Sequence, residues 1–130
     1  MNMKKVLIDT NFLLIPVQFK VDIFSEIERI CDFDYKLYIL DKTTEELESI
    51  IKTQKGKSKD AAKLALRLIV LKGINTIKTE KNVYADTAIT NIAAKEGFIV
   101  ATQDKGLKMR LKAKNVPIMT LRQKKYVIWG

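Results

Sequence analysis

Short apolar segments of strand length alternate with helix-like segments along most of this chain. Lys4–Ile8 and Leu37–Leu40 are apolar runs too short for helices, whereas Val21–Ile30 between them carries isoleucines at helical spacing. Strands that alternate with helices are joined by crossover connections, which leave neighbouring strands parallel and cover both faces of the sheet. The alternation therefore predicts an α/β fold, a three-layer α/β/α sandwich with a central, mainly parallel sheet.

The remaining elements continue this alternation. Further helices are predicted after the cap residues Asp41–Thr44, across Leu64–Leu71 up to Gly73, at Ala85–Glu96 and at Lys105–Lys112. Further strands are predicted at Ile74–Thr79, Phe98–Ala101, Pro117–Leu121 and Tyr126–Trp129. Two segments stay outside them: an apolar patch broken at Pro16, and the polar, basic stretch Lys52–Asp60, which we expect to be a mobile loop. No repeat or linker divides the sequence, so we expect one domain over residues 1–130.

The chain contains no histidine and a single cysteine, Cys31. The lack of histidine excludes Ser-His-Asp and Cys-His nucleophilic catalysis, and it excludes histidine acid–base pairs. The usual zinc sites are excluded as well, because they need imidazoles or clustered thiolates. Any metal must therefore be held by oxygen atoms, which favours Mg²⁺ or Mn²⁺.

Cys31 alone permits no intrachain disulfide, which suits a reducing cytosol. No apolar run approaches the roughly 20 residues of a membrane helix, and the first apolar run is too short for a signal peptide. We therefore expect a cytoplasmic protein without a membrane partner.

The net charge of +9 is distributed unevenly along the chain. Residues 1–50 contain 6 Lys/Arg and 10 Asp/Glu, a balance of −4, whereas residues 51–130 contain 18 and 5, a balance of +13. Such asymmetry is typical of a surface that binds a polyanion. A solvated, lysine-rich surface without a partner is the alternative interpretation, and the charge alone does not separate the two.

Four carboxylates lie at or after the predicted carboxyl ends of strands, where parallel sheets bind their ligands. Asp9 directly ends the first strand, Asp104 follows a later strand, Asp86 opens a helix, and Glu46 lies in the first turns of another. Loops at the carboxyl ends of parallel strands converge, so we expect these side chains to meet at one edge of the sheet. Carboxylates that close together need a counter-charge, and Mg²⁺ or Mn²⁺ accepts such oxygen ligands. The pattern predicts a metal site.

Three of these carboxylates also have an ordinary structural interpretation. Asp86 and Asp104 could serve only as helix caps or turn residues, and Glu46 could be a solvated residue favoured by the helix dipole. Asp9 is the hardest to explain in this way, because packing does not account for a carboxylate that ends a buried strand. The individual residues leave both interpretations open, and the four together favour a metal site.

Around these residues the sequence resembles the PIN-domain nucleases over nearly its whole length. VLIDTN at residues 6–11 resembles the first motif of that family, TTEELESI at residues 43–50 the second, and VYADTAITNIAAKEGFIVATQDKGLKMRLKAKNVPIMTL at residues 83–121 the C-terminal block. In the second motif the glutamate before the apolar residue is Glu46, not Glu45. The resemblance implies a catalytic metal site with Asp9, Glu46, Asp86 and Asp104 as ligands and Thr10, Asn11 and Thr102 in support.

Within that family, DTNFLL, YAD and PIMTLRQKKYVI are most similar to the branch that contains the small-subunit processome nuclease and its archaeal relatives. That branch often has a second acid after Asp86, where this chain has Thr87. The resemblance implies a Mg²⁺- or Mn²⁺-dependent endoribonuclease that hydrolyses RNA phosphodiesters, leaves 5′-phosphates and acts in rRNA processing. VapC-type toxins share the same four acids, so a toxin–antitoxin ribonuclease is the alternative. Expected partners are RNA such as pre-rRNA, and an antitoxin or a ribosome-assembly protein; a homodimer also fits.

Two groups of basic residues are candidates for RNA binding. They are Lys52, Lys55, Lys57 and Lys59 in the expected loop, and Lys105, Lys108, Arg110 and Lys112 in the expected helix. Such side chains neutralise phosphates and give salt-sensitive, weakly sequence-specific affinity. Aromatic residues do not interleave with them, which argues against strong base stacking. We expect Tyr84, Tyr126 and Trp129 in the core or in an interface.

Other classes fit the sequence less well. A haloacid-dehalogenase-type phosphatase needs an acid two positions after the first Asp, where this chain has Asn11. A receiver domain needs an acidic pair before its strand-end Asp, and dinucleotide binding needs a glycine-rich turn after the first strand. A catalytically silent RNA-binding or ribosome-assembly module remains a different alternative, against which the presence of all four acids argues.

Overall fold

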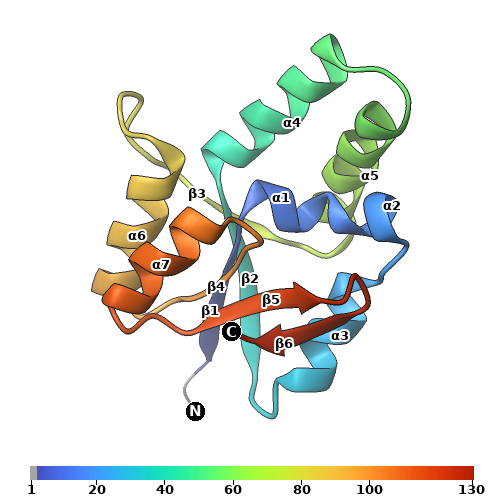
Figure 1. The fold of residues 1–130 in the computed structure, drawn as a ribbon. Helices are drawn as coiled ribbons and strands as arrows, with labels where there is room; N and C mark the ends of the chain where they lie inside the picture. The colour runs from blue at the N-terminus through green and yellow to red at the C-terminus, as the bar shows by residue number, and fades with distance from the viewer. Residues whose placement is uncertain (1–2) are drawn as a thin grey trace.

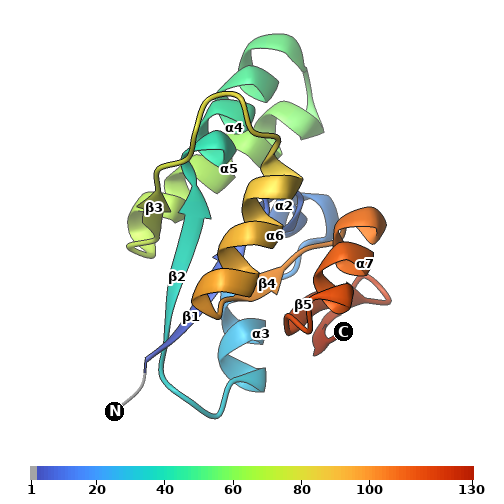
Figure 2. The same ribbon diagram turned by 90° about the vertical axis from the view of Figure 1, so that its left-hand side faces the viewer.

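The computed structural model describes residues 3–130, which form a six-stranded sheet with helices on both faces (Figure 1, Figure 2). The strands are β1 (Lys4–Ile8), β2 (Tyr35–Leu40), β3 (Asn75–Ile77), β4 (Ile99–Ala101), β5 (Ile118–Arg122) and β6 (Tyr126–Trp129). The helices are α1 (Thr10–Leu13), α2 (Ile15–Phe19), α3 (Ile23–Ile30), α4 (Asp41–Thr53), α5 (Lys57–Leu71), α6 (Ala85–Glu96) and α7 (Lys105–Ala113). In this part of the chain no helix is long and apolar enough to span a bilayer.

The strand order is β3-β2-β1-β4-β5-β6. The first five strands pair in parallel, and β6 pairs antiparallel with β5 as the second strand of a hairpin. From β1 the chain builds outward through β2 to β3, and it then returns through α6 to the other side of β1. The prediction of a three-layer sandwich with a mainly parallel sheet is confirmed.

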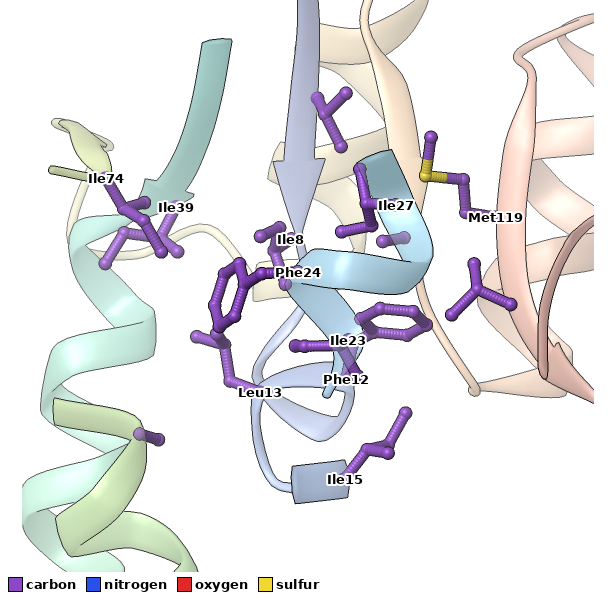
Figure 3. Close-up of a cluster of buried hydrophobic side chains, with 14 of the residues drawn as sticks. Ile8, Phe12, Leu13, Ile15, Ile23, Phe24, Ile27, Ile39, Ile74 and Met119 are labelled. Atoms are coloured by element: carbon purple, nitrogen blue, oxygen red, sulfur yellow. The ribbon is translucent and has the colours of Figure 1, made fainter. Parts of the chain in front are cut away.

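The side chains of β1 alternate between two cores, because successive residues of a strand point to opposite faces. Val6 and Ile8 face the core that is covered by α1, α2, α3 and α5, where they share a cluster with Phe12 and Ile27 (Figure 3). Leu7 faces the second core, under α6 and α7. Both faces of the central strand β1 are therefore buried in apolar cores.

Two short helices occupy the segment in which we predicted no regular structure. α1 begins directly after Asp9, and α2 follows it. Pro16 lies in the first turn of α2, where its missing N–H is not needed and its fixed φ suits a helix. Phe12 and Leu13 are fully buried, so burial rather than helix length stabilises this segment.

The predicted mobile loop at Lys52–Asp60 is wrong. α4 continues to Thr53 and α5 begins at Lys57, so only residues 54–56 connect the two helices. Gly56 has a φ of 64°, which a glycine adopts without strain and which allows the sharp reversal. The two helices pack against each other as a hairpin that projects from the sheet (Figure 1).

Phe12 anchors the turn that follows Asp9, so its replacement tests this part of the fold. We expect Phe12→Ala to lower the free energy of unfolding by about 3–5 kcal/mol, because it removes a buried ring and leaves a cavity. Phe19→Ala is the control, since Phe19 is 36% exposed, and it should cost about 1 kcal/mol or less. Urea denaturation measures both, and an equal destabilisation by the two replacements would contradict the anchoring role.

Candidate active site

The carboxyl ends of β1 and β4 lie side by side at the centre of the sheet. The chain leaves β1 towards β2 on one side and reaches β4 on the other side only after β3. At such a reversal of strand order, open α/β sheets bind their ligands beyond the carboxyl ends of the strands. Asp9 follows β1 directly, and its backbone N–H donates to the carbonyl oxygen of Ala101 in β4 (2.9 Å). Asp9 thus occupies the switch point.

The side chain of Asp9 is buried, with 7% of the residue exposed. Its Oδ1 accepts a hydrogen bond from the backbone N–H of Thr10 (2.9 Å). Its Oδ2 accepts from Nδ2 of Asn11 (3.0 Å) and from the hydroxyl of Thr102 (2.8 Å). A carboxylate has about four lone-pair positions, so these three donors fix the orientation of Asp9 and leave Oδ1 free to accept one more ligand.

Glu46 reaches this edge from α4. The helix begins at Asp41, so the predicted cap residues already lie inside it. The hydroxyl of Thr10 donates to the hydroxyl of the buried Thr43 (2.9 Å), which fixes α4 against α1. Residues three apart share a helix face, so this contact turns Glu46 towards Asp9.

Asp104 is positioned by the segment after β4. The Thr102 hydroxyl that donates to Asp9 also accepts from the backbone N–H of Asp104 (3.1 Å). Asp104 is the N-cap of α7, since its Oδ1 accepts from the N–H of Leu107 (2.8 Å). The cap interpretation is therefore correct for Asp104, but it uses only Oδ1, and Oδ2 has no hydrogen-bond donor within residues 3–130.

Asn11 and Gln103 connect the segments that follow β1 and β4. Oδ1 of Asn11 accepts from the backbone N–H of Gln103 (3.0 Å), while its Nδ2 donates to Asp9. Oε1 of Gln103 in turn accepts from the N–H of Leu121 (2.6 Å) and from the hydroxyl of Thr120 (2.8 Å). These bonds attach the loop after β4 to β1 and to β5.

Asp86 enters the site from the first turn of α6. The N-cap of this helix is Tyr84, so Asp86 is not a cap, contrary to one interpretation of the sequence. No donor among the described residues bonds to its carboxyl group, whose oxygens are therefore free.

The loop that leads to α6 is attached to the start of α4. Asp41 accepts the backbone N–H (3.1 Å) and the hydroxyl (2.6 Å) of Thr79. Nζ of Lys42 donates to the carbonyl oxygen of Glu80 (2.7 Å). Because α4 also carries Glu46, this helix positions both Glu46 and the loop that leads to Asp86.

The electrostatics indicate that the four carboxylates influence one another. Burial raises the pKa of Asp9 above its ordinary value of 3.8, and the charges of Asp86 and Asp104 raise it further, against hydrogen bonds that lower it. Although Glu46 is exposed as a residue, partial burial of its carboxyl group raises its pKa, and the charges of Asp9 and Asp86 add to this. Like charges have therefore been brought together without a cationic side chain between them.

These carboxylates suit a hard divalent cation by their chemistry. The donor set consists of oxygen atoms, and Asp9, Asp86 and Asp104 each keep an oxygen position available. Within residues 3–130, however, no three metal-binding side chains stand close enough to enclose an ion as they are placed. Mutual repulsion keeps uncompensated carboxylates apart, and a cation removes that repulsion. Asp104 is exposed and Asp86 is half-buried, so neither side chain is locked by packing.

The predicted RNA-binding residues form two separate groups. Lys105, Lys108, Arg110 and Lys112 lie on α7, which begins beside Asp104. Lys52, Lys55, Lys57 and Lys59 lie at the tip of the α4–α5 hairpin. Lys52 follows Glu46 by six residues, which is about 9 Å along the helix axis, so the second group is separated from the carboxylates by at least this distance.

Three lysines of α7 share one face, since they are spaced three and four residues apart. Partial burial lowers the pKa of Lys108, and the charges of Lys112 and Lys105 lower it further, so these ammonium groups are close together. Arg110 points elsewhere and donates to the hydroxyl of Thr87 on α6 (3.2 Å). The lysine face, rather than the whole predicted set, is therefore the basic surface next to Asp104.

Sequence reasoning missed several residues that support the site. Thr43 and Gln103 contact partners that are distant in the sequence, so no local pattern marks them. Asp41 did carry a signal, because it directly follows β2 just as Asp9 follows β1.

Of the three aromatic residues that we expected in the core or in an interface, none lies in the core. Tyr84 is 86% exposed, Tyr126 is 50% exposed and Trp129 is 43% exposed. Trp129 contacts Phe33, with ring centroids 6.2 Å apart, at the opposite edge of the sheet from β3.

The fold and this edge of carboxylates define the class of protein. Residues 6–124 match the family described as the PIN like domain, and the chain belongs to this family.

Two relatives from archaea are similar over almost the whole chain. Ribonuclease VapC4 of Methanocaldococcus jannaschii is 40% identical over 125 residues, which cover 95% of each protein. Ribonuclease VapC9 of Archaeoglobus fulgidus is 30% identical over 121 residues, which cover 92% of this chain and 84% of that protein.

Solved structures share the fold. The PIN domain endonuclease Utp24 superposes with a TM-score of 0.79 and 26% identity, over 97% of this chain and 90% of that one. A domain of a functionally unknown protein from Methanocaldococcus jannaschii superposes with a TM-score of 0.62 and 20% identity, over 92% and 91%.

The raised pKa of Asp9 predicts how stability depends on pH. Between its unfolded value, near 3.8, and its higher folded value, the folded state binds more protons, so stability falls as pH rises through this window. We therefore expect wild-type protein in EDTA to lose stability relative to Asp9→Asn as the pH rises from 3.8 through the raised pKa of folded Asp9. Thermal unfolding of both proteins measures the difference, in which carboxylates that do not interact with Asp9 cancel.

Added Mn²⁺ at neutral pH should raise the unfolding temperature of the wild type and leave Asp9→Asn nearly unchanged, because an ion that binds only the folded state stabilises it. If the unfolding temperatures of the two proteins changed in parallel with pH and responded equally to Mn²⁺, the assignment of Asp9 as a metal ligand would be contradicted.

Proposed function

We propose that this protein is a Mg²⁺- or Mn²⁺-dependent endoribonuclease that hydrolyses phosphodiester bonds of RNA. The observation that carries the proposal is the burial of Asp9 where the charges of Asp86 and Asp104 raise its pKa, an unfavourable arrangement that a cation would relieve. The ribonuclease names of two relatives and the likeness to the endonuclease Utp24 support the same activity.

In this proposal the cation is held by Asp9, Glu46, Asp86 and Asp104. When bound, such an ion activates water and offsets charge on the attacked phosphate and the leaving oxygen. Thr10, Asn11 and Thr102 keep the carboxylate of Asp9 fixed, so it need not reorganise as charge develops.

The lysine face of α7 would contact phosphates next to the cut, because it begins beside Asp104. The lysines at the tip of the α4–α5 hairpin would contact a longer RNA at a distance from the cut. Both groups supply counter-charge to the RNA backbone and carry no base specificity.

Two cellular roles are candidates for this activity. The first is pre-rRNA processing with a ribosome-assembly partner, supported by the sequence motifs and by the likeness to Utp24. The second is that of a VapC-type toxin with an antitoxin partner, which the 40% identity to Ribonuclease VapC4 favours. Sequencing of RNA 5′ ends from cells depleted of this protein separates the two roles, since only the first role predicts that unprocessed pre-rRNA accumulates. The presence of all four acids argues against a non-catalytic RNA-binding module.

Neutral replacement of the carboxylates tests the proposed activity. We expect Asp9→Asn, Asp104→Asn and Glu46→Gln each to lower metal-dependent cleavage of RNA by at least about 100-fold, because each removes a ligand charge. Glu45→Gln is the matched control: it changes the same charge one residue away on α4 and should cleave like the wild type. Full activity of purified Asp9→Asn would refute the site, and inactive Glu45→Gln beside active Glu46→Gln would reassign the ligand.

The two basic groups can be compared by salt dependence. We expect replacement of Lys105, Lys108 and Lys112 by glutamine to weaken binding of short and long RNA, and to reduce the salt slope by about 0.7 for each phosphate that is no longer neutralised. The same replacement of Lys52, Lys55 and Lys57 removes equal charge and should affect only long RNA. Unchanged slopes in both variants would show that these lysines form a solvated surface that does not bind RNA.

A further inference from the structure

Tyr84 is the most exposed large hydrophobic residue in the part of the chain that the structure describes, at 86%. A single exposed apolar side chain needs no explanation by itself. Tyr84 differs from the others in its place, in its support and in its surroundings.

Its place is the start of α6. Tyr84 is the N-cap of this helix and lies two residues before Asp86, which is less than one helical turn. The charge of Asp86 raises the pKa of both Asp9 and Glu46, so this end of α6 lies at the carboxylate edge. An aromatic ring at this position is within reach of a nucleotide near the attacked phosphate.

Its support is a loop that is held at several points. Asp41 accepts two hydrogen bonds from Thr79, and Lys42 donates to Glu80 (2.7 Å), all before the chain reaches Tyr84. The carbonyl oxygen of Tyr84 also accepts the first bond of the helix, from Ala88 (3.0 Å). The ring is therefore presented to solvent by an ordered backbone, which lowers the entropy that a ligand must remove on binding.

Its surroundings carry both signs of charge: Glu80 and Asp86 are acidic, and two lysines supply positive charge. Lys78 and Lys81 lie in the same loop, both exposed, and neither has an ion-pair partner among residues 3–130. An exposed aromatic ring and unpaired lysines in one loop can bind single-stranded nucleic acid, since bases stack on the ring and phosphates contact the lysines.

We propose that Tyr84 is a stacking platform for an unpaired base of RNA next to the cut site. The proposal rests on the function proposed above and adds the form of the substrate. A base inside a duplex is already stacked on its neighbours and cannot lie on the ring, so the RNA must be single-stranded at the cut.

The experiment uses a single-stranded RNA whose cut site has been mapped with wild-type protein. We expect Tyr84→Ala to raise KM for cleavage by roughly 5- to 150-fold, with a smaller change in kcat, as for the removal of one stacked base. Tyr84→Phe keeps the ring and should behave like the wild type. Tyr126→Ala is the matched control, because that exposed tyrosine lies on the outermost strand β6, which β5 separates from β4.

The RNA offers a complementary change. For wild-type protein, an abasic nucleotide beside the cut should raise KM as much as Tyr84→Ala does with the intact RNA. The two changes together should raise KM no more than either one alone, since both remove the same stacking interaction. A complementary strand across the cut should abolish cleavage. Fully additive effects, or unchanged KM in Tyr84→Ala, would overturn the proposal.

Binding separates this proposal from the proposed activity. RNA affinity is measured in the Asp9→Asn background, where cleavage is not required. Weaker binding by Asp9→Asn/Tyr84→Ala than by Asp9→Asn/Tyr84→Phe supports the platform even if the wild type cleaves no RNA. Equal binding, or no RNA binding by either protein, rejects it even if the metal-dependent activity is real.

Discussion

Burial of the Asp9 charge at the end of a central strand is unfavourable, and the surrounding structure offsets that cost. Three donors reach its two oxygens: the backbone N–H of Thr10, the amide of Asn11 and the hydroxyl of Thr102. Two of them follow β1 in the sequence, and the third follows β4. A buried carboxylate can persist at this position only while β1 and β4 stay in register. The site and the centre of the sheet therefore depend on each other.

The other carboxylates are connected to Asp9 through short chains of hydrogen bonds. Thr102 leads to the backbone of Asp104, and Thr10 leads through Thr43 to α4 and so to Glu46. The start of α4 then holds the loop before α6 through two bonds from Thr79. The site is thus built by elements that are fixed to one another, although Asp86 and Asp104 keep free oxygens. Such a framework can bring like charges together at a cost that local side-chain rotation and a cation can reduce.

Periodicity and the rules for parallel sheets were enough to predict the strands and the mainly parallel sheet, while the meeting of the four acids around one ion stays a prediction. What they could not predict depends on tertiary contacts. Phe12 makes a four-residue helix stable by burial, which no helix propensity indicates. Gly56 suggested a long loop, but one sharp turn suffices because α4 and α5 pack on each other. Gln103 shows no local signal, since its partners Thr120 and Leu121 lie on the next strand.

The placement of charge favours a polyanion-binding surface over a merely solvated one. In residues 3–130 a single ion pair forms, between Arg29 and Glu26, far from the carboxylate edge. Lys105 directly follows Asp104, and Lys108 lies close enough for the charge of Asp104 to raise its pKa, yet neither lysine forms an ion pair with Asp104. Paired lysines would neutralise the carboxylates and compete with a cation. Because the acids and the lysines are unpaired, the acids are free to bind the proposed cation and the lysines are free to bind phosphates.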